Sequence, residues 1–418
     1  MFKKLKNNMT PSVTVILIFG IISMLGDMVY ETARSANSQY LSLIGVSASK
    51  VGLVFGIGEF IGYFLRLFAG VMSDKTGKYW AVMFLGYGML IVVPLMGFTL
   101  NWNILIILIL MERIGKSLRN PAKDTILSSV AENEVGLGIA FGLQEFLDQI
   151  GAFTGPLIFT AVFYIFDKNG LPEYQLGYKL LVLPFLALIA FLLFAKSKIQ
   201  KEKIIEEINI REFRQDKLKP VFWLYSLFTF FCTLGFLNFS TIGYHIKASE
   251  LMTDGDITLI YSLAMAVDAI SALLIGKLYD HYKEKLGTKT GGILVLIVLP
   301  FITFTLPFFA LTQSKNMIVI GMLIFGIIMG AHETIMRSAI ADITPFYKRG
   351  TSYGIFNTSY GLALFLGAYT MGVLYEHNNI KTIISLSFVT EFIALVLFYK
   401  MYKLIRNNAD ISDDSNKL

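Results

Sequence analysis

Acidic and basic residues stand in the middle of long apolar stretches of this sequence. A charged side chain at the centre of a membrane helix costs about 2.5–3.5 kcal/mol on insertion scales, and such a residue is functional by default. Asp27, Glu31 and Arg34 follow the i, i+4, i+7 spacing of a single helix face. Further ionisable or polar residues of this kind occur in later apolar stretches: Glu59, Glu112, Arg113, Lys116, Arg119, Lys123, Glu145, Asp148, Gln149, Asp268, His332, Glu333, Arg337 and Glu391.

Carboxyl groups beside cations in an apolar environment can take up and release protons. Burial favours the neutral form of a carboxyl group, and a neighbouring cation favours its charged form. A cation that moves would therefore load and release a proton, and we expect this at Asp27, Glu145 and Asp148. The competing interpretation is that about half of the charges form structural ion pairs, such as Arg113 with Asp148. Glu112 with Lys116 is a second such candidate pair.

The elements that must position these residues are membrane helices. The chain has 418 residues, of which 55% are hydrophobic and 16% charged, whereas soluble domains carry about 25% charged residues. A hydrocarbon core about 30 Å thick needs about 20 apolar residues per helix, so the sequence predicts an all-α membrane protein with roughly twelve spans. The expected spans are residues 12–36, 47–72, 79–99, 102–128, 135–166, 174–195, 220–244, 257–279, 291–311, 317–342, 350–375 and 382–402.

The charged stretch 196–219 divides the spans into two sets of six. We expect an N-terminal bundle (1–195), a cytoplasmic linker (196–219), a C-terminal bundle (220–403) and a cytoplasmic tail (404–418). Lys and Arg accumulate in cytoplasmic loops, and here they concentrate in the linker and at both termini, which are therefore expected inside the cell. The loops predicted to be external carry only scattered lysines: Lys50, Lys168, Lys179, Lys247, Lys315 and Lys381.

Short motifs recur at equivalent places in the two halves. Gly70, Asp74, Lys75, Gly77 and Lys78 form the pattern G-x-x-x-D-K-x-G-K after span two. The shorter pattern G-x-x-x-D follows span eight at Gly276 and Asp280, and R-x-x-x-x-D ends both span four and span ten. Internal duplication of this kind is how many secondary transporters are built.

These motifs resemble those of the major facilitator superfamily of secondary transporters. The loop from Gly70 to Lys78 is similar to the family's loop signature, and the copy at Gly276 and Asp280 lies where the family has one. The resemblance implies two pseudo-symmetric six-helix bundles, with Asp74 latching the cytoplasmic side shut against the start of span eleven near Gly350 and Thr351.

A second motif is similar to the family's antiporter signature. Gly151, Gly155 and Pro156 match G-x-x-x-G-P, although Leu157, Ile158 and Phe159 replace the further glycines of the full signature. This resemblance favours efflux over uptake as the direction of transport.

Together these observations predict proton-coupled efflux of a small amphipathic molecule by alternating access. The alternative within this class is transport of an organic anion or another metabolite, favoured by the cations Lys116, Arg119 and Lys123. A membrane-embedded enzyme, a channel and a receptor are remote alternatives, because no catalytic spacing and no repeated ring of ligands occurs. The four histidines and Cys232 lack metal-ligand spacing, so neither a metal nor a cofactor is expected. We expect a monomer in the cell membrane that binds substrate and protons but no nucleic acid.

Overall fold

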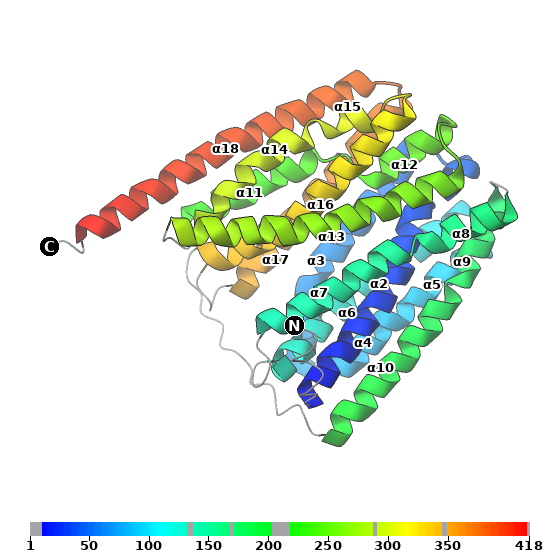
Figure 1. The fold of residues 1–418 in the computed structure, drawn as a ribbon, viewed down its shortest axis with the longest axis horizontal. Coiled ribbons are helices and arrows are strands. Elements are labelled where there is room, and N and C mark those ends of the chain that lie inside the picture. Colours follow the sequence, from blue (N-terminus) through cyan, green and yellow to red (C-terminus); the bar gives the residue numbers. More distant parts are fainter. Residues whose placement is uncertain are drawn as a thin grey trace. The chain divides into compact units, whose positions relative to one another are not determined.

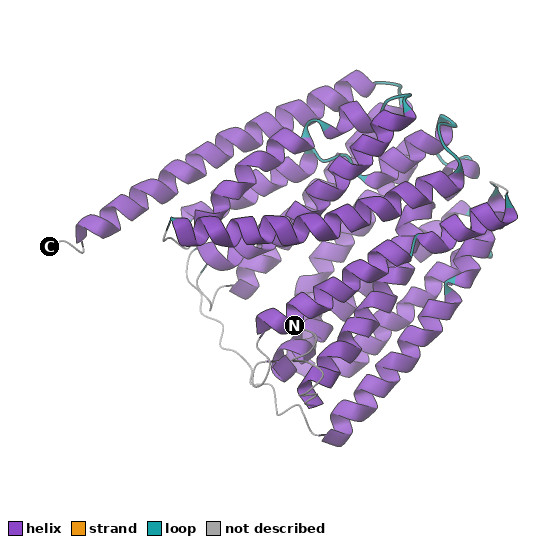
Figure 2. Cartoon of the chain, in the orientation of Figure 1, coloured by secondary structure: helices purple, strands orange, loops and turns teal. Residues whose placement is uncertain are grey.

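The computed structural model describes residues 11–131, 137–167, 170–202, 218–286, 291–344 and 349–415. Within these ranges the regular elements are helices and no strand occurs (Figure 1, Figure 2). The predicted all-α membrane fold is therefore confirmed.

Each predicted span corresponds to one helix or to a short run of helices. Seven spans are continuous in the described ranges: α2 (Pro11–Leu43), α3 (Ala48–Thr76), α6 (Trp102–Ala131), α13 (Asp254–Lys285), α16 (Lys315–Ile343), α17 (Arg349–Glu376) and α18 (Ile380–Ser415). Five are divided: α4 (Tyr79–Gly88), η1 (Met89–Ile91) and α5 (Val92–Met96); α7 (Leu137–Thr154) and α8 (Leu157–Phe166); α9 (Leu171–Leu180) and α10 (Val182–Glu202); α11 (Pro220–Leu234) and α12 (Phe239–Ala248); η2 (Gly291–Ile297), α14 (Val298–Thr303) and α15 (Leu306–Ala310).

Ten of these helices or runs are long and apolar enough to cross a membrane, among the described residues. Of the twelve expected spans, α6 and α17 fall outside this set. In α6 the reason is charge, because Glu112, Arg113, Lys116, Arg119 and Lys123 interrupt its apolar sequence. At 30 residues the helix is nevertheless about 45 Å long, which is sufficient to span a bilayer.

Two of the breaks within spans coincide with proline or glycine. Pro156 separates α7 from α8, and Gly235 caps the C-terminus of α11. Proline has no amide hydrogen to donate, and its ring clashes with the preceding turn. Broken helices are tolerated in a membrane where neighbouring groups satisfy the freed backbone. The side-chain hydroxyl of Ser387 does this for Gly235, donating to its carbonyl oxygen at 2.9 Å.

The chain forms two compact units. The first comprises residues 1–46, 61–211 and 246–266, and the second comprises 47–60, 212–245 and 267–418. The helices α3 and α13 each contribute residues to both. The domain boundaries expected from the sequence stay a prediction, although α10 and α18 extend past the expected ends of their spans, to Glu202 and Ser415.

Glycines allow helices to approach closely inside each unit. In the first unit, α2 and α7 lie side by side (Figure 1), and a Cβ on Gly151 would clash with the carbonyl oxygen of Met24. In the second unit, a Cβ on Gly372 of α17 would come within 2.7 Å of the carbonyl oxygen of Ala48, at the start of α3. Small residues at such crossings are typical of membrane helices, because they let backbones approach.

Candidate functional site

Two cations of α6 converge on one aromatic ring of α2. The Arg113 guanidinium hydrogen-bonds the Tyr30 hydroxyl, and its Cζ lies 4.8 Å from the ring centroid. The ammonium of Lys116 lies 3.5 Å from the same centroid. A cation over an aromatic face is stabilised by about 0.5–2 kcal/mol, with the larger values for desolvated sites. Tyr30 is 2% exposed, so it holds both cations inside the first unit.

A second cluster joins α2, α6 and α7. The Lys123 ammonium donates to the Ser23 hydroxyl at 2.7 Å and lies 3.9 Å from the Asp148 carboxylate. Asp27 interacts electrostatically with Lys116 and Lys123 and repels Asp148. This cluster, Ser23, Asp27, Lys123 and Asp148, therefore holds two carboxylates that both interact with one cation, Lys123.

Glu31 and Arg34 form an ion pair on α2 that extends to α13. Their closest charged atoms are 3.5 Å apart, and the Glu31 carboxylate also accepts a hydrogen bond of 2.5 Å from the hydroxyl of Tyr261. Glu31 is 7% exposed. This carboxylate is thus tied to a residue from the second half of the sequence within the same compact unit.

The other first-half candidates have different settings. Glu112 pairs with the adjacent Arg113 at 3.3 Å, and Asp148 pairs with Lys123, where the sequence suggested Lys116 and Arg113 respectively. Glu145 is exposed and accepts a hydrogen bond from Gln149 at 3.4 Å. Its side chain therefore differs from Asp148 in solvent access.

Glu59 and the second-half candidates belong to the second compact unit. Glu59 is half-buried on the part of α3 that belongs to the second unit. Asp268 is 2% exposed on α13, where a Cβ on Gly330 of α16 would come within 2.6 Å of its carbonyl oxygen. Glu333 is half-buried, and the side chain of Arg337 lies outside the described residues. The roles expected of these residues stay predictions.

The loop motif after span two is described only in part. Gly77 has a φ of +62° and closes α3, with its amide donating to the carbonyl oxygen of Ser73, a conformation that favours glycine at a helix end. Gly70 lies near Pro121 with ordinary spacing, and Lys78 is exposed. The side chains of Asp74, Lys75 and Thr351 and the surroundings of Gly350 lie outside the described residues, so the latch stays a prediction.

The equivalent motifs of the second half meet through Asp342. Its carboxylate accepts hydrogen bonds from Tyr279 at 2.9 Å and from Lys283 at 2.7 Å, both on α13. Asp280 itself is exposed, and Gly276 lies near Thr334 with ordinary van der Waals spacing. The described contact between the ends of spans eight and ten therefore runs through Tyr279 and Lys283.

The antiporter-like motif has a packing role. Gly151 and Gly155 face α2, where a Cβ on Gly155 would come within 2.5 Å of both the Met28 carbonyl oxygen and the Thr32 hydroxyl. Pro156 lies between α7 and α8. The motif therefore sets how closely spans one and five pack.

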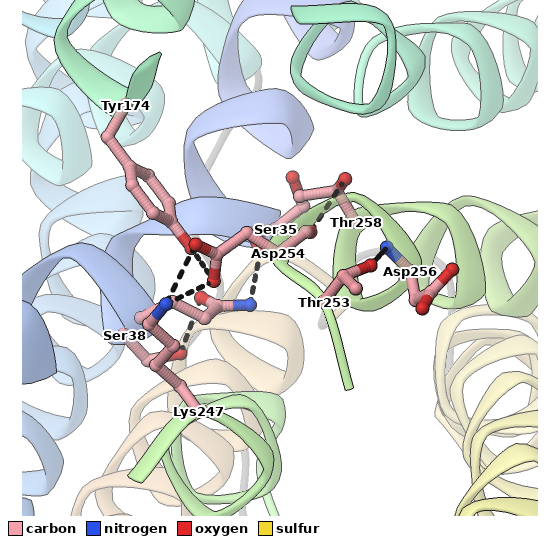
Figure 3. Close-up of polar contacts among 9 residues, drawn as sticks. Ser35, Ser38, Tyr174, Lys247, Thr253, Asp254, Asp256 and Thr258 are labelled. Carbon is pink, nitrogen blue, oxygen red and sulfur yellow. Dashed lines mark hydrogen bonds and ion pairs between the residues drawn. The ribbon is translucent and has the colours of Figure 1, made fainter. Parts of the chain in front are cut away.

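A third polar cluster, centred on the fully buried Asp254, surrounds the start of α13 (Figure 3). The Asp254 carboxylate accepts hydrogen bonds from the hydroxyl of Tyr174 at 2.8 Å and from the ammonium of Lys247 at 2.7 Å. Farther along α13, Thr258 pairs with Thr160 at 2.8 Å, and the Ser262 hydroxyl donates to the carbonyl oxygen of Phe153 at 2.5 Å. We call this row of contacts the α13 zipper.

Sequence reasoning did not identify Ser23, Tyr30, Tyr174, Asp254 or Tyr261 as parts of a site. Asp254 lies at a predicted loop, and a tyrosine or serine in an apolar stretch carries no charge that marks it. Only the pairing of distant residues reveals their role, such as Tyr261 with Glu31.

Comparisons with known proteins agree with the fold. A family model described as Major Facilitator Superfamily matches residues 16–368 and 243–413. An uncharacterized protein of Mycobacterium tuberculosis is 34% identical over 390 residues, which cover 92% of each chain. An uncharacterized transporter of the same superfamily type from Methanocaldococcus jannaschii is 25% identical over 92% of this chain and 94% of its own.

Solved transporters share the architecture at low sequence identity. A bacterial homologue of the human lysosomal transporter Spinster, in an inward-facing and unoccupied conformation, has a TM-score of 0.67 at 14% identity and covers 95% of this chain and 98% of its own. The nucleoside transporter NupG has a TM-score of 0.65 at 14% identity, with 94% of this chain and 99% of its own covered. The family match and the mycobacterial relative, each spanning most of the sequence, establish that this chain belongs to the major facilitator superfamily of transporters.

Proposed function

We propose that this secondary transporter couples the movement of protons to the export of a small amphipathic molecule. Coupling is assigned to the first half, at Asp27 and Asp148. Export is proposed from the similarity of Gly151, Gly155 and Pro156 to the antiporter signature.

The observation that carries the proposal is that two carboxylates, Asp27 and Asp148, share one cation, Lys123. Asp148 lies 3.9 Å from Lys123, and Asp27 interacts with both Lys123 and Lys116. Asp148 has one buried oxygen without a hydrogen-bond partner among the described residues. A buried carboxylate oxygen that lacks a donor is stabilised by taking up a proton, and the approach of a cation reverses this preference. Movement of α6 relative to α2 and α7 would therefore change which carboxyl group holds a proton.

The experiment begins by finding a ligand. A thermal-shift screen of the purified protein against amphipathic cations, anions and neutral drugs selects compounds that bind the folded state, since a ligand at 100 times its Kd stabilises by about 2.7 kcal/mol. The most stabilising compound is then used in proteoliposomes with an imposed pH gradient. We expect Asp27→Asn and Asp148→Asn to abolish gradient-driven accumulation, while exchange without a gradient survives in at least one of them.

Glu250→Gln is the matched control, because it removes an exposed carboxyl group from the same compact unit. It should keep most of the gradient-driven transport. If both Asp variants retain accumulation, the cluster is structural and the proposed coupling at these residues is wrong.

One observation favours a second candidate, the transport of an organic anion. Arg119 is 2% exposed, and neither of its terminal nitrogens has a hydrogen-bond acceptor among the described residues. Its Cζ lies 5.3 Å from the ring centroid of Tyr87. A buried guanidinium with open donors suits a carboxylate or a phosphate. The charge of the ligands found in the screen separates the two candidates, and Arg119→Gln should selectively weaken anion binding.

A further inference from the structure

The second half contains a buried carboxyl group that the proposed coupling does not use. Glu391 lies on α18 with 2% of its surface exposed. No oxygen or nitrogen donor of the described residues reaches either of its carboxylate oxygens. It stands eleven residues after the start of α18, which at 1.5 Å per residue places it about 16 Å along that span, near mid-membrane.

Glu391 faces the break in span seven. The helix α11 ends at Leu234, Gly235 caps it, and α12 begins at Phe239. A Cβ on Gly235 would come within 2.7 Å of the nearer Glu391 oxygen and would clash with the Thr390 hydroxyl. The carboxyl group therefore lies directly against the C-terminal end of α11.

This position is unfavourable for a negative charge. The last carbonyl groups of a helix lack intrahelical donors and carry the negative end of the helix dipole. A carboxylate beside them adds repulsion to the cost of burying an unpaired charge. A positive species must therefore bind here, or the group must be neutral.

No permanent cation of the described residues stands beside Glu391. From α11 the titratable neighbour is the thiol of Cys232, which interacts with the carboxyl group. The elements η2, α14 and α15 also pack against α18, and their sequences contain no titratable residue. Lys381 and Lys400 lie on α18 itself, about 15 Å and 13 Å along the helix from Glu391.

Beyond Phe236 lie two further titratable groups. The ring of His332 on α16 is 5.3 Å from that of Phe236, and its Nδ1 is 3.1 Å from the hydroxyl of Tyr360 on α17. On α17, Tyr360 is therefore the titratable group on this side. Gly367 of the same helix lies close to the carbonyl oxygen of Leu234, and Tyr369 is the titratable residue in the sequence around it.

We propose that Glu391, set against the broken end of α11, is a second proton-binding site of this transporter. A proton from water forms an O–H bond with one carboxylate oxygen, and the charge of the group changes from −1 to zero. The hydroxyl of the protonated Glu391 can donate a hydrogen bond at the C-terminal end of α11, where Ser387 supplies the other side-chain donor. When α11 and α18 separate and water reaches the carboxyl group, the proton leaves.

This proposal deepens the proposed proton coupling, but its test does not depend on transport. Infrared difference spectra between alkaline and acidic pH are recorded for the purified protein in lipid nanodiscs, in sodium-free buffer. Protonation of Glu391 should give a carbonyl-stretch band of a carboxylic acid in an apolar environment. Glu391→Gln should lose this band, and Glu391→Asp should keep it at a shifted position. Persistence of the whole band in Glu391→Gln overturns the proposal.

Two controls locate the signal. Glu376→Gln removes an exposed carboxyl group from the same compact unit and should leave the band unchanged. The double variant Asp27→Asn/Asp148→Asn should also keep the band, so failure of the proposed coupling in the first half is distinguishable from failure at Glu391.

If Glu391→Gln does not fold, the unaltered protein is treated with a hydrophobic carbodiimide instead, and the modified residue is located by mass spectrometry. Glu391 should be modified at low pH and lose this reactivity at high pH.

The last arm tests sodium as the bound cation. Sodium chloride is added at constant alkaline pH with potassium chloride as the control. A carboxylate band that responds to sodium, together with no response to pH, would mean that a metal ion neutralises Glu391 and that the proton site is wrong.

Discussion

At the scale of single residues, the charges of the first half owe their burial to specific partners. Lys123 hydrogen-bonds Ser23 and pairs with Asp148, and Arg113 pairs with Glu112 and hydrogen-bonds Tyr30. All of these contacts lie within the first compact unit. Removing one member of a buried pair costs about 3–5 kcal/mol, because the other charge stays buried, whereas removing both can be neutral. Stability measurements can therefore separate a structural pair from a pair that also carries protons.

The pair of Lys123 and Asp148 allows this separation. We expect Lys123→Met to lower the free energy of unfolding by about 3 kcal/mol, because it leaves Asp148 without its cation. The double variant Lys123→Met/Asp148→Asn should regain most of that loss. Unfolding in detergent, monitored by intrinsic fluorescence, measures both. Equal instability of the single and double variants would mean that Lys123 contributes packing rather than charge compensation.

Tyr30 offers a graded test of the two cations that it holds. Tyr30→Phe keeps the ring beneath Lys116 but removes the hydroxyl bonded to Arg113, whereas Tyr30→Leu removes both interactions. We expect the loss of stability to rise from the first variant to the second by about 1 kcal/mol, the typical strength of a cation–π contact. The same loss in both would assign the whole effect to the hydroxyl.

At the scale of elements, close helix contacts explain the glycine motif of span five. The Cβ of Gly151→Ala would clash with the carbonyl oxygen of Met24, and overpacking of this kind costs about 1–3 kcal/mol. We therefore expect Gly151→Ala to reduce the thermal stability and the transport rate together. Gly88→Ala is the control, because no atom lies within 4 Å of its added Cβ. A variant of Gly151 with unchanged stability but altered coupling would show that the motif acts beyond packing.

Sequence reasoning located the elements better than the contacts between them. Apolar runs placed span four at 102–128 and the structure has it at Trp102–Ala131, because the hydrocarbon thickness fixes the length of any span. The break between α11 and α12 was not predicted, since Gly235 within an apolar run is equally typical of close packing. The ion pairs of the structure join Asp148 to Lys123 and Glu112 to Arg113. Helical spacing alone does not select these partners, because it shows which residues share a face but not which helices bring those faces together.

At the scale of the whole molecule, the distribution of basic residues predicts the orientation in the membrane. Lys and Arg are concentrated in the predicted linker and at the termini, and this bias sets which loops stay in the cytoplasm. Reporter fusions after Asn169 and Ser314 should therefore behave as external. Fusions within 196–219 and after Asn408 should behave as cytoplasmic, and the opposite pattern would contradict the twelve-span topology.

The α13 zipper provides a test of alternating access that complements the predicted latch. With that topology, Lys247 lies toward the outside, so the zipper holds α13 against spans five and six at their outer ends. A hydrogen bond to a charged group contributes about 1.5–3 kcal/mol. Removing the one between Tyr174 and Asp254 should therefore favour the separated state by about tenfold or more.

The probe is a cysteine at position 160, whose native threonine hydrogen-bonds Thr258 inside the zipper. In a Cys232→Ser background, Thr160→Cys is labelled with a membrane-impermeant maleimide from outside. We expect Tyr174→Phe to raise its labelling rate, because the outer contact opens more often. Asp74→Asn should lower that rate, because loss of the cytoplasmic latch favours the inward-open state, in which the zipper is closed. Opposite responses to the two substitutions would mean that both sites bias a single equilibrium. If both substitutions raise the rate, each has only loosened its own surroundings, and the zipper and the latch do not belong to one conformational cycle.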